Sequence, residues 1–236
     1  MAQLAGLERA AYVHTMFARL AKHYDRLNRL VSAGQDEKWR RRVIDLARVP
    51  SGGRVLDIGT GTGDLVREVL RRDNLALAVG GDFTMEMMRQ GQARPCSEHI
   101  RWLNTNALDL PFPGESFDAV VSGYLLRNVV DVQQALAEKY RVLKPGGTVV
   151  CLDTTPPPSD WQHGPVHFYL RTIIPMLGRL IADEAEAYTY LPESTVHFLQ
   201  AEELAACMQR AGFQAVHFLR LMFGTMAIHW GRKKDD

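Results

Sequence analysis

Three glycines at alternate positions constrain the fold of this chain more than any other feature. Gly59, Gly61 and Gly63 directly follow the apolar segment 54–58, and Asp64 then opens a segment with a helical pattern. Glycines at this spacing let the backbone approach a ligand without Cβ obstruction, and the helix start offers free N–H groups. A dinucleotide fingerprint starting at Gly59 would need glycine at position 64, and the carboxylate of Asp64 disfavours a pyrophosphate there. The loop therefore predicts a ligand site of another kind.

Short apolar runs alternate with helical patterns on both sides of this loop. Such alternation is typical of a mostly parallel sheet flanked by helices, a Rossmann-like α/β fold. The last two expected strands are joined by only residues 222–224, so we expect them to form an antiparallel hairpin. The expected strands are 54–58, 77–81, 100–103, 117–122, 148–152, 213–221 and 225–230, and the expected helices are 65–72, 85–94, 132–143 and 202–211.

Two appendages flank this core. Residues 7–48 have a helical pattern that is broken at 28–36, and the apolar residues Met16, Phe17, Leu20, Tyr24, Leu27 and Leu30 recur there every three or four positions. After the fifth strand, prolines at 156–158 stop regular structure and an apolar run follows at 166–181. We therefore expect an N-terminal helical cap at 1–48 and a ligand-binding domain at 49–236, with a helical lid inserted at about 156–195.

Charge and cysteine content disfavour several classes of protein. Lys and Arg number 28 against 27 Asp and Glu, so the net charge is +1 and no long-range attraction to nucleic acid is expected. Cys96, Cys151 and Cys207 are far apart and form no C-x-x-C, which indicates buried, reduced thiols and no metal site. The N-terminal sequence has neither a secretory apolar segment nor a membrane span, so we expect a cytoplasmic protein.

Polar groups follow the next two strands. Asp82 comes directly after the second strand, where a carboxylate at the carboxyl edge of the sheet can accept hydrogen bonds from both hydroxyls of a ribose. The alternative role of Asp82 is to cap the helix that starts near Met85. The amide of Asn106, or the backbone N–H of Ala107, follows the third strand and can contact an adenine edge.

The loop pattern D-x-G-x-G-x-G, which starts at Asp57, resembles motif I of class I S-adenosylmethionine methyltransferases. A narrower resemblance, to the ubiquinone/menaquinone biosynthesis C-methyltransferases, covers nearly the whole chain. It depends chiefly on two segments, Leu126-Arg127-Asn128-Val129 and Tyr188-x-Tyr190-Leu191. Further support comes from Asn106-Ala107-x-x-Leu110-Pro111-Phe112, Arg141-Val142-Leu143-Lys144-Pro145-Gly146-Gly147, Tyr24-Asp25-x-x-Asn28 and His229-x-Gly231.

This resemblance implies S-adenosylmethionine as the cofactor, with contacts at Thr62, Asp82, Asn106 and Ala107. The loop and the end of the fourth strand add further cofactor-binding candidates: Asp57, Gly59, Gly61, Gly63 and Gly123. Three segments depart from the family pattern, namely Gly123-Tyr124-Leu125, Gln35-Asp36-Glu37 and Asp153-Thr154-Thr155. Because these segments are expected near the acceptor pocket, the departures bear on the substrate more than on the reaction.

The reaction implied by the resemblance is methyl transfer to a ring carbon of a reduced prenylated quinone, such as demethylmenaquinol. Arg127 is the catalytic candidate, since its fixed positive charge can stabilise a phenolate or polarise a water, and Asn128 would orient that water or the substrate. An ion pair with Asp131 or Glu138 is the alternative role of Arg127. The candidates for acceptor contact are Tyr124, Tyr188, Tyr190 and His229; for the last three, plain packing is the alternative, and His229 is also a candidate base.

Two other functions remain open at this stage. One keeps the cofactor and changes the acceptor to another small or lipidic molecule. The other is an inactive cofactor-binding subunit of a quinone-pathway complex. A homodimer is also left open, as is a peripheral membrane contact through the apolar run 166–181, for which a core or lid helix is the alternative.

Overall fold

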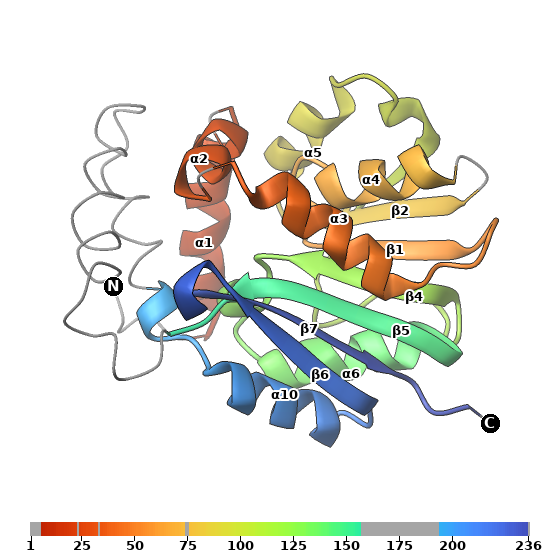
Figure 1. The fold of residues 1–236 in the computed structure, drawn as a ribbon. Coiled ribbons are helices and arrows are strands. Elements are labelled where there is room, and N and C mark those ends of the chain that lie inside the picture. The colour runs from red at the N-terminus through yellow and green to blue at the C-terminus, as the bar shows by residue number, and fades with distance from the viewer. Residues whose placement is uncertain (1–5, 23, 33, 74–75, 157–193, 236) are drawn as a thin grey trace.

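A computed structural model describes residues 6–22, 24–32, 34–73, 76–156 and 194–235. Within these residues one sheet has the strand order β3-β2-β1-β4-β5-β7-β6 (Figure 1). The first five strands are parallel to one another, and β7 pairs antiparallel with both β5 and β6. The expected Rossmann-like fold with a C-terminal antiparallel hairpin is therefore confirmed. The strands are β1 (Arg54–Ile58), β2 (Leu77–Asp82), β3 (Ile100–Asn104), β4 (Phe117–Gly123), β5 (Leu143–Thr154), β6 (Gln214–Leu221) and β7 (Met226–Arg232).

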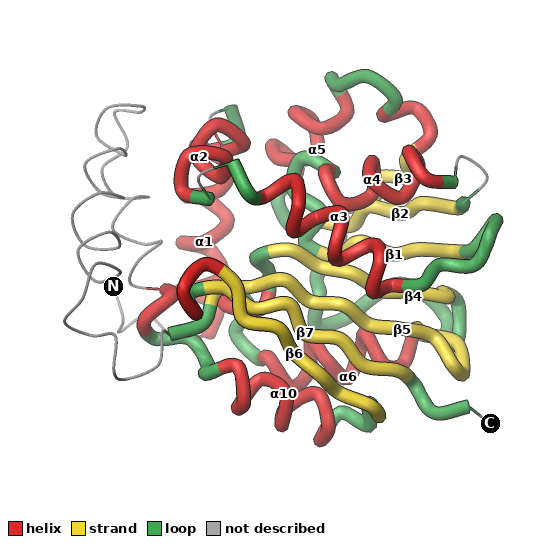
Figure 2. Tube along the Cα trace, in the orientation of Figure 1, coloured by secondary structure: helices red, strands yellow, loops and turns green. Residues whose placement is uncertain are grey.

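Helices cover both faces of this sheet, as Figure 2 shows. Alternate residues of the central strands point to opposite faces, so Val55 packs with α3 and α4, whereas Leu56 packs with α6 and α10. The helices of the core are α3 (Asp36–Ala47), α4 (Asp64–Arg72), α5 (Met85–Gln92), α6 (Val132–Val142) and α10 (Ala201–Arg210). The expected helices agree with these bounds to within two residues, because each carries one apolar stripe that the sheet buries.

The strand order reverses between β1 and β4, which both pair with their neighbours in parallel. At such a switch point the connections leave β1 and β4 toward opposite faces, and a crevice opens beyond the carboxyl ends of the strands. Gly59 lies at the end of β1, and Tyr124 follows β4. The fold therefore places the predicted loop at the position where open α/β sheets bind ligands.

The N-terminal region is divided differently from the sequence prediction. Helix α1 (Gly6–Leu20) is followed by a separate helix α2 (Tyr24–Val31), so a second break precedes the expected one. Helix α3 packs against β4 and β5 and belongs to the sheet core. Helices α1 and α2 stand beside the carboxyl edge of the sheet (Figure 1).

The described residues also include three short 3-10 helices: η1 (Ser97–His99), η2 (Leu126–Asn128) and η5 (Met222–Gly224). Cys151 and Cys207 are buried as predicted, whereas the prediction is wrong for Cys96, which is exposed. Among the described helices none is both long and apolar enough to cross a membrane. Most of the predicted lid falls within 157–193, outside the described residues.

Candidate functional site

A cavity of about 330 Å³ opens at the carboxyl ends of β1, β2 and β4. Its floor is the edge of the sheet, and its wall comes from α1 and α2, which contribute Val13, Phe17 and Tyr24. Eight residues predicted for the site from sequence line this one cavity: Gly59, Gly61, Asp82, Asn106, Ala107, Gly123, Tyr124 and Asn128. The sheet edge thus brings together segments that lie far apart in the sequence.

The glycine loop has a backbone that side chains would obstruct. Gly59, Gly61 and Gly63 have φ values of 74°, 56° and 83°, which favour glycine. A Cβ at Gly59 would lie 2.8 Å from Leu125 Cδ1, and one at Gly63 would lie 2.5 Å from Trp102. Glycine is therefore required here both for conformation and for close packing.

Asp82 holds the loop against the end of β2. Its carboxylate accepts the N–H of Gly61 at 2.7 Å and the N–H of Thr84 at 2.8 Å. Burial raises the pKa of Asp82 above its usual range, and the N–H donors oppose this rise. The N-cap position of α5 is held by Thr84, not Asp82, and the Thr84 side chain makes no capping hydrogen bond. The carboxylate lines the cavity.

The segment after β3 forms the next part of the wall. Asn106 Oδ1 accepts the N–H of Leu108 at 3.0 Å, which fixes the side chain across the turn. Asn104, which the sequence prediction missed, donates its amide to the carbonyl oxygens of Asp82 and Phe83 at 2.9 and 3.0 Å. This bond ties the ends of β2 and β3 together beside the cavity.

Arg127 is buried behind the cavity wall. It is 4% exposed, and its Nη1 lies 3.6 Å from Asp153 Oδ1. Its guanidinium carbon lies 5.2 Å from the ring centroid of Tyr124, and its Nε has no hydrogen-bond partner. Tyr124 itself has a φ of 60°, an uncommon conformation for a bulky residue.

The suggested ion pairs of Arg127 with Asp131 and Glu138 are both wrong. Asp131 caps α6 by accepting the N–H of Gln134 at 2.9 Å. Glu138 pairs with Arg141 at 2.7 Å. Asp153 takes the place of these partners because β5 runs beside β4 and ends near η2.

Four of the remaining predicted site residues do not line this cavity. Asp57 is buried beneath the loop, where its carboxylate accepts the hydroxyl of Thr60 at 2.7 Å. Burial raises the pKa of Asp57 to about 7. The hydroxyl of Thr62 donates to Asp25 of α2 at 2.8 Å, and Gly63 is the N-terminal cap position of α4.

His229 is the fourth, and it is a core residue. It is 1% exposed on β7, its Nε2 lies 2.9 Å from the carbonyl oxygen of Ala201, and its ring stacks on Phe218. Burial lowers the pKa of His229 to about 4. We therefore leave His229 out of the proposed site. Tyr188 and Tyr190 lie outside the described residues.

The sequence prediction also missed side chains from α1 and α2. His14 packs edge-on against Phe83, with ring centroids 5.4 Å apart, and Phe17 packs against Tyr24 at 5.8 Å. Burial raises the pKa of Tyr24 above its usual range. Phe17 and Tyr24 belong to the apolar stripe seen in the sequence, so that stripe could have indicated an enclosing wall.

Comparisons with known proteins identify the family of this chain. Residues 6–233 match the model of the ubiE/COQ5 methyltransferase family. A Desulfotalea psychrophila protein named ubiquinone/menaquinone biosynthesis C-methyltransferase UbiE is 46% identical, covering 96% of this chain and 92% of that protein. A Roseiflexus protein named demethylmenaquinone methyltransferase is 42% identical, covering 96% of this chain and 95% of that protein.

The fold is also similar to that of solved methyltransferases. The structure of a SAM-dependent methyltransferase from Thermotoga maritima matches with a TM-score of 0.65 and 22% identity, over 94% of this chain and 100% of that one. The chain therefore has the class I methyltransferase fold. The family match covers nearly all of it, and with the relatives above it shows that this chain is a methyltransferase of the ubiE/COQ5 family.

Proposed function

We propose that this protein transfers a methyl group from S-adenosylmethionine to a ring carbon of a reduced prenylated quinone. The names of the relatives support this proposal. The observation that carries it is the composition of the cavity, which is lined both by the polar side chains of Asp82 and Asn106 and by apolar side chains from α1, α2 and residues 129–130. Such a cavity suits a polar cofactor next to an apolar acceptor.

The cavity residues fit S-adenosylmethionine. Asp82 offers a carboxylate to a ribose, Asn106 and Ala107 can contact an adenine edge, and Gly59 and Gly61 line the same cavity. When bound, this cofactor supplies a methyl group on a positively charged sulfur, which is already activated for transfer. The task left to the protein is alignment of the two reactants. Such alignment can lower the activation barrier by about 7 kcal/mol or more.

The acceptor would lie against the aromatic and apolar part of the wall. Phe17 and Tyr24 come from the N-terminal helices, and Val130 is half exposed at the cavity. Asn128 lines the same part, and its amide donates to the carbonyl oxygen of Tyr124 at 2.7 Å. This bond fixes the orientation of the Asn128 amide.

Arg127 would act through its charge. Because a guanidinium stays protonated in proteins, Arg127 cannot accept the ring proton. Its ion pair with Asp153 fixes the guanidinium behind Tyr124, where the charge favours a phenolate on the acceptor. Methylation at carbon would then form a carbon–carbon bond as the methyl–sulfur bond of the donor breaks, leaving S-adenosylhomocysteine. The ring carbon would lose its proton to a base or a water.

A labelling experiment tests the proposal. The protein is incubated with methyl-labelled S-adenosylmethionine and a panel of reduced demethylated quinones and simple phenols, and the products are identified by mass spectrometry. We expect label on a ring carbon of the prenylated quinols. Label on a phenolic oxygen contradicts C-methylation, and label only on acceptors without a quinol ring favours the second candidate, another small or lipidic substrate.

A further inference from the structure

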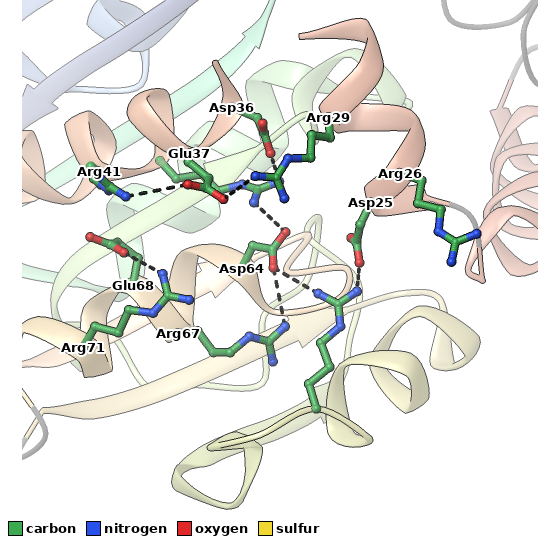
Figure 3. A pocket seen from close by; sticks show the side chains of 12 residues that line it. Asp25, Arg26, Arg29, Asp36, Glu37, Arg41, Asp64, Arg67, Glu68 and Arg71 are labelled. Atoms are coloured by element: carbon green, nitrogen blue, oxygen red, sulfur yellow. Dashed lines mark hydrogen bonds and ion pairs between the residues drawn. The ribbon is translucent and has the colours of Figure 1, made fainter. Parts of the chain in front are cut away.

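A second cavity, of about 320 Å³, lies next to the glycine loop and is lined almost entirely by charged side chains (Figure 3). It is enclosed by α2, α3, α4 and the residue Arg94, which follows α5. Seven of its lining residues are arginines and five are carboxylates: Arg26, Arg29, Arg40, Arg41, Arg67, Arg71 and Arg94, with Asp25, Asp36, Glu37, Asp64 and Glu68. The N-terminal helices thus meet the cofactor loop across a set of ion pairs.

The outer ion pairs of this cavity join exposed side chains. Glu37 pairs with Arg29 at 3.2 Å and with Arg41 at 3.6 Å, and these two arginine side chains are 68% and 60% exposed. Exposed pairs of this kind contribute little to stability, because water screens them and the side chains lose entropy. Within the part of the chain that the structure describes, neither of these pairs reaches the glycine loop.

The inner contacts reach that loop directly. Asp25 accepts the hydroxyl of Thr62 at 2.8 Å and pairs with Arg94. Arg94 also lies 3.1 Å from Asp64, the first residue of α4. Asp25 therefore joins the first turn of α2 to the loop and to the start of the following helix.

Arg67 of α4 also contacts the glycine loop. Arg67 donates to the carbonyl oxygens of Thr62 and Gly91. The backbone of Thr62 is thereby fixed from α4, while its hydroxyl is committed to Asp25 rather than to the apolar cavity. Thr62 consequently acts as the junction between the cofactor loop and α2.

The position of Asp25 in α2 also matters for the other cavity. Its neighbour Tyr24 lines the apolar cavity, and both belong to the first turn of the helix. Consecutive helical residues point about 100° apart, so one helix turn can contribute to both cavities. Whatever fixes Asp25 also fixes Tyr24.

We propose that Asp25 and Arg94 are positioning residues that lock α2 onto Thr62 and thereby hold the glycine loop in the conformation that binds the methyl donor. The claim about the donor rests on the proposed function, whereas the lock on α2 does not. Asp25 touches neither reactant; it acts through Thr62. The lock depends on charge, so it weakens as salt rises from about 0.1 M to about 1 M and the Debye length falls from about 10 Å to about 3 Å.

Three variants test the lock. Asp25→Asn keeps an acceptor for Thr62 and loses the charge opposite Arg94. Thr62→Val removes the hydroxyl at nearly constant shape, whereas Thr62→Ser keeps the hydroxyl. Glu37→Gln is the matched control, since it removes an ion pair of the same cavity that does not reach the loop. Hydrogen exchange of residues 24–31 is measured without ligand, and S-adenosylmethionine affinity is measured by calorimetry.

We expect Asp25→Asn and Thr62→Val to speed exchange in residues 24–31 about fivefold and to weaken donor binding about fivefold, corresponding to loss of one partly exposed pair. Thr62→Ser and Glu37→Gln should stay within about twofold of the unmodified protein, and high salt should affect Asp25→Asn less than the unmodified protein. Exchange and affinity that match the control in both Asp25→Asn and Thr62→Val overturn the proposal. If the unmodified protein does not bind S-adenosylmethionine, the cofactor assignment fails, and exchange alone still decides on the lock.

Discussion

Two cavities of nearly equal volume flank the glycine loop, about 330 and about 320 Å³, and their linings are opposite in character. The one at the sheet edge is bounded by Phe17, Tyr24 and Val130 with a few polar groups. The one under α2 and α3 is lined by arginines and carboxylates. Volume therefore does not distinguish a ligand site from a structural contact between helices in this protein. The hydrogen-bond and ion-pair partners of the polar groups make that distinction.

In the charged cavity the acidic side chains are satisfied by the protein itself. Asp36 pairs with Arg40 at 3.0 Å, and the same arginine pairs with Asp64 at 2.8 Å. An added ligand would have to break pairs that already exist. At the sheet edge, by contrast, Asp82 accepts only backbone N–H groups among the bonds described above, and a carboxylate with two oxygens can accept more. The comparison predicts that changes at the sheet edge affect ligands and that changes in the charged cavity affect the loop.

The largest effect should come from Arg127. We expect Arg127→Ala to lower kcat about 100-fold, because the charge that favours the phenolate is lost, while the affinity for S-adenosylmethionine changes less than about twofold. Turnover is measured with the prenylated quinol that gives the best rate, and affinity by calorimetry. Near-normal turnover would remove Arg127 from the mechanism.

A second variant separates this role from simple damage. Arg127→Ala leaves Asp153 buried without its ion-pair partner, and such a lone charge costs about 3–5 kcal/mol of stability. In the double variant with Asp153→Asn that charge is gone. If the double variant regains turnover, the loss in Arg127→Ala came from the unpaired carboxylate and not from the missing guanidinium.

The next largest effect concerns the carboxylate of Asp82. Asp82→Ala should weaken S-adenosylmethionine binding more than about tenfold, since it removes the ribose acceptor and the acceptor for the N–H of Gly61. Asp118→Ala is a matched control, because Asp118 also accepts a backbone N–H, from Arg54 at 2.8 Å, away from the cavity. Calorimetric affinities that fall equally in both variants would contradict the assignment.

How far the sequence predicted this arrangement depends on the range of the interactions. The strands, the glycine loop and Asp82 follow from local patterns, since apolar alternation and glycine spacing express the conformation of the same few residues. The hairpin of β6 and β7 was predicted for the same reason, from a short connection. These features also predicted Gly59, Gly61 and Asp82, which line the cavity at the sheet edge.

The remaining contacts join segments that only the folded chain brings together. The ion pair of Arg127 with Asp153 depends on how η2 packs beside the end of β5, whereas the partners named from the sequence were Asp131 and Glu138. The contact of Thr62 with Asp25 spans 37 residues. No periodicity encodes such contacts, because they depend on the final placement of α2 against the loop.

A pH experiment tests Asp57, which is buried beneath the glycine loop and lines neither cavity. The pKa of Asp57 is raised from 3.8 to about 7 by burial, so the folded protein binds a proton more tightly than the unfolded chain does. The contribution of Asp57 to stability is therefore fully present below pH 3.8 and is lost as the pH rises through about 7. Asp57→Asn should remove this dependence while keeping an acceptor for Thr60.

The free energy of unfolding is measured for both proteins by urea titration across this pH range. Relative to Asp57→Asn, the unmodified protein should lose about 1.4 kcal/mol for each pH unit between the two pKa values. A difference that stays constant with pH would show that Asp57 has the same pKa in the folded and unfolded states.

The smallest effect tests whether the apolar cavity takes the tail of the acceptor. Val130 lines this cavity and is 42% exposed, so a prenyl chain could cover the rest of its side chain. Val130→Thr keeps the shape and replaces one methyl group by a hydroxyl, which should raise KM about threefold for a prenylated quinol, the cost of part of one buried methyl group. KM for a quinol without a tail should not change.

Val196→Thr is the matched control, because Val196 is 50% exposed and does not line this cavity. An equal rise in KM for the prenylated and the tail-less quinol would place the ring, and not the tail, against Val130. No rise for either quinol would place the acceptor elsewhere on the cavity wall. The difference between the two cavities would then concern the cofactor alone.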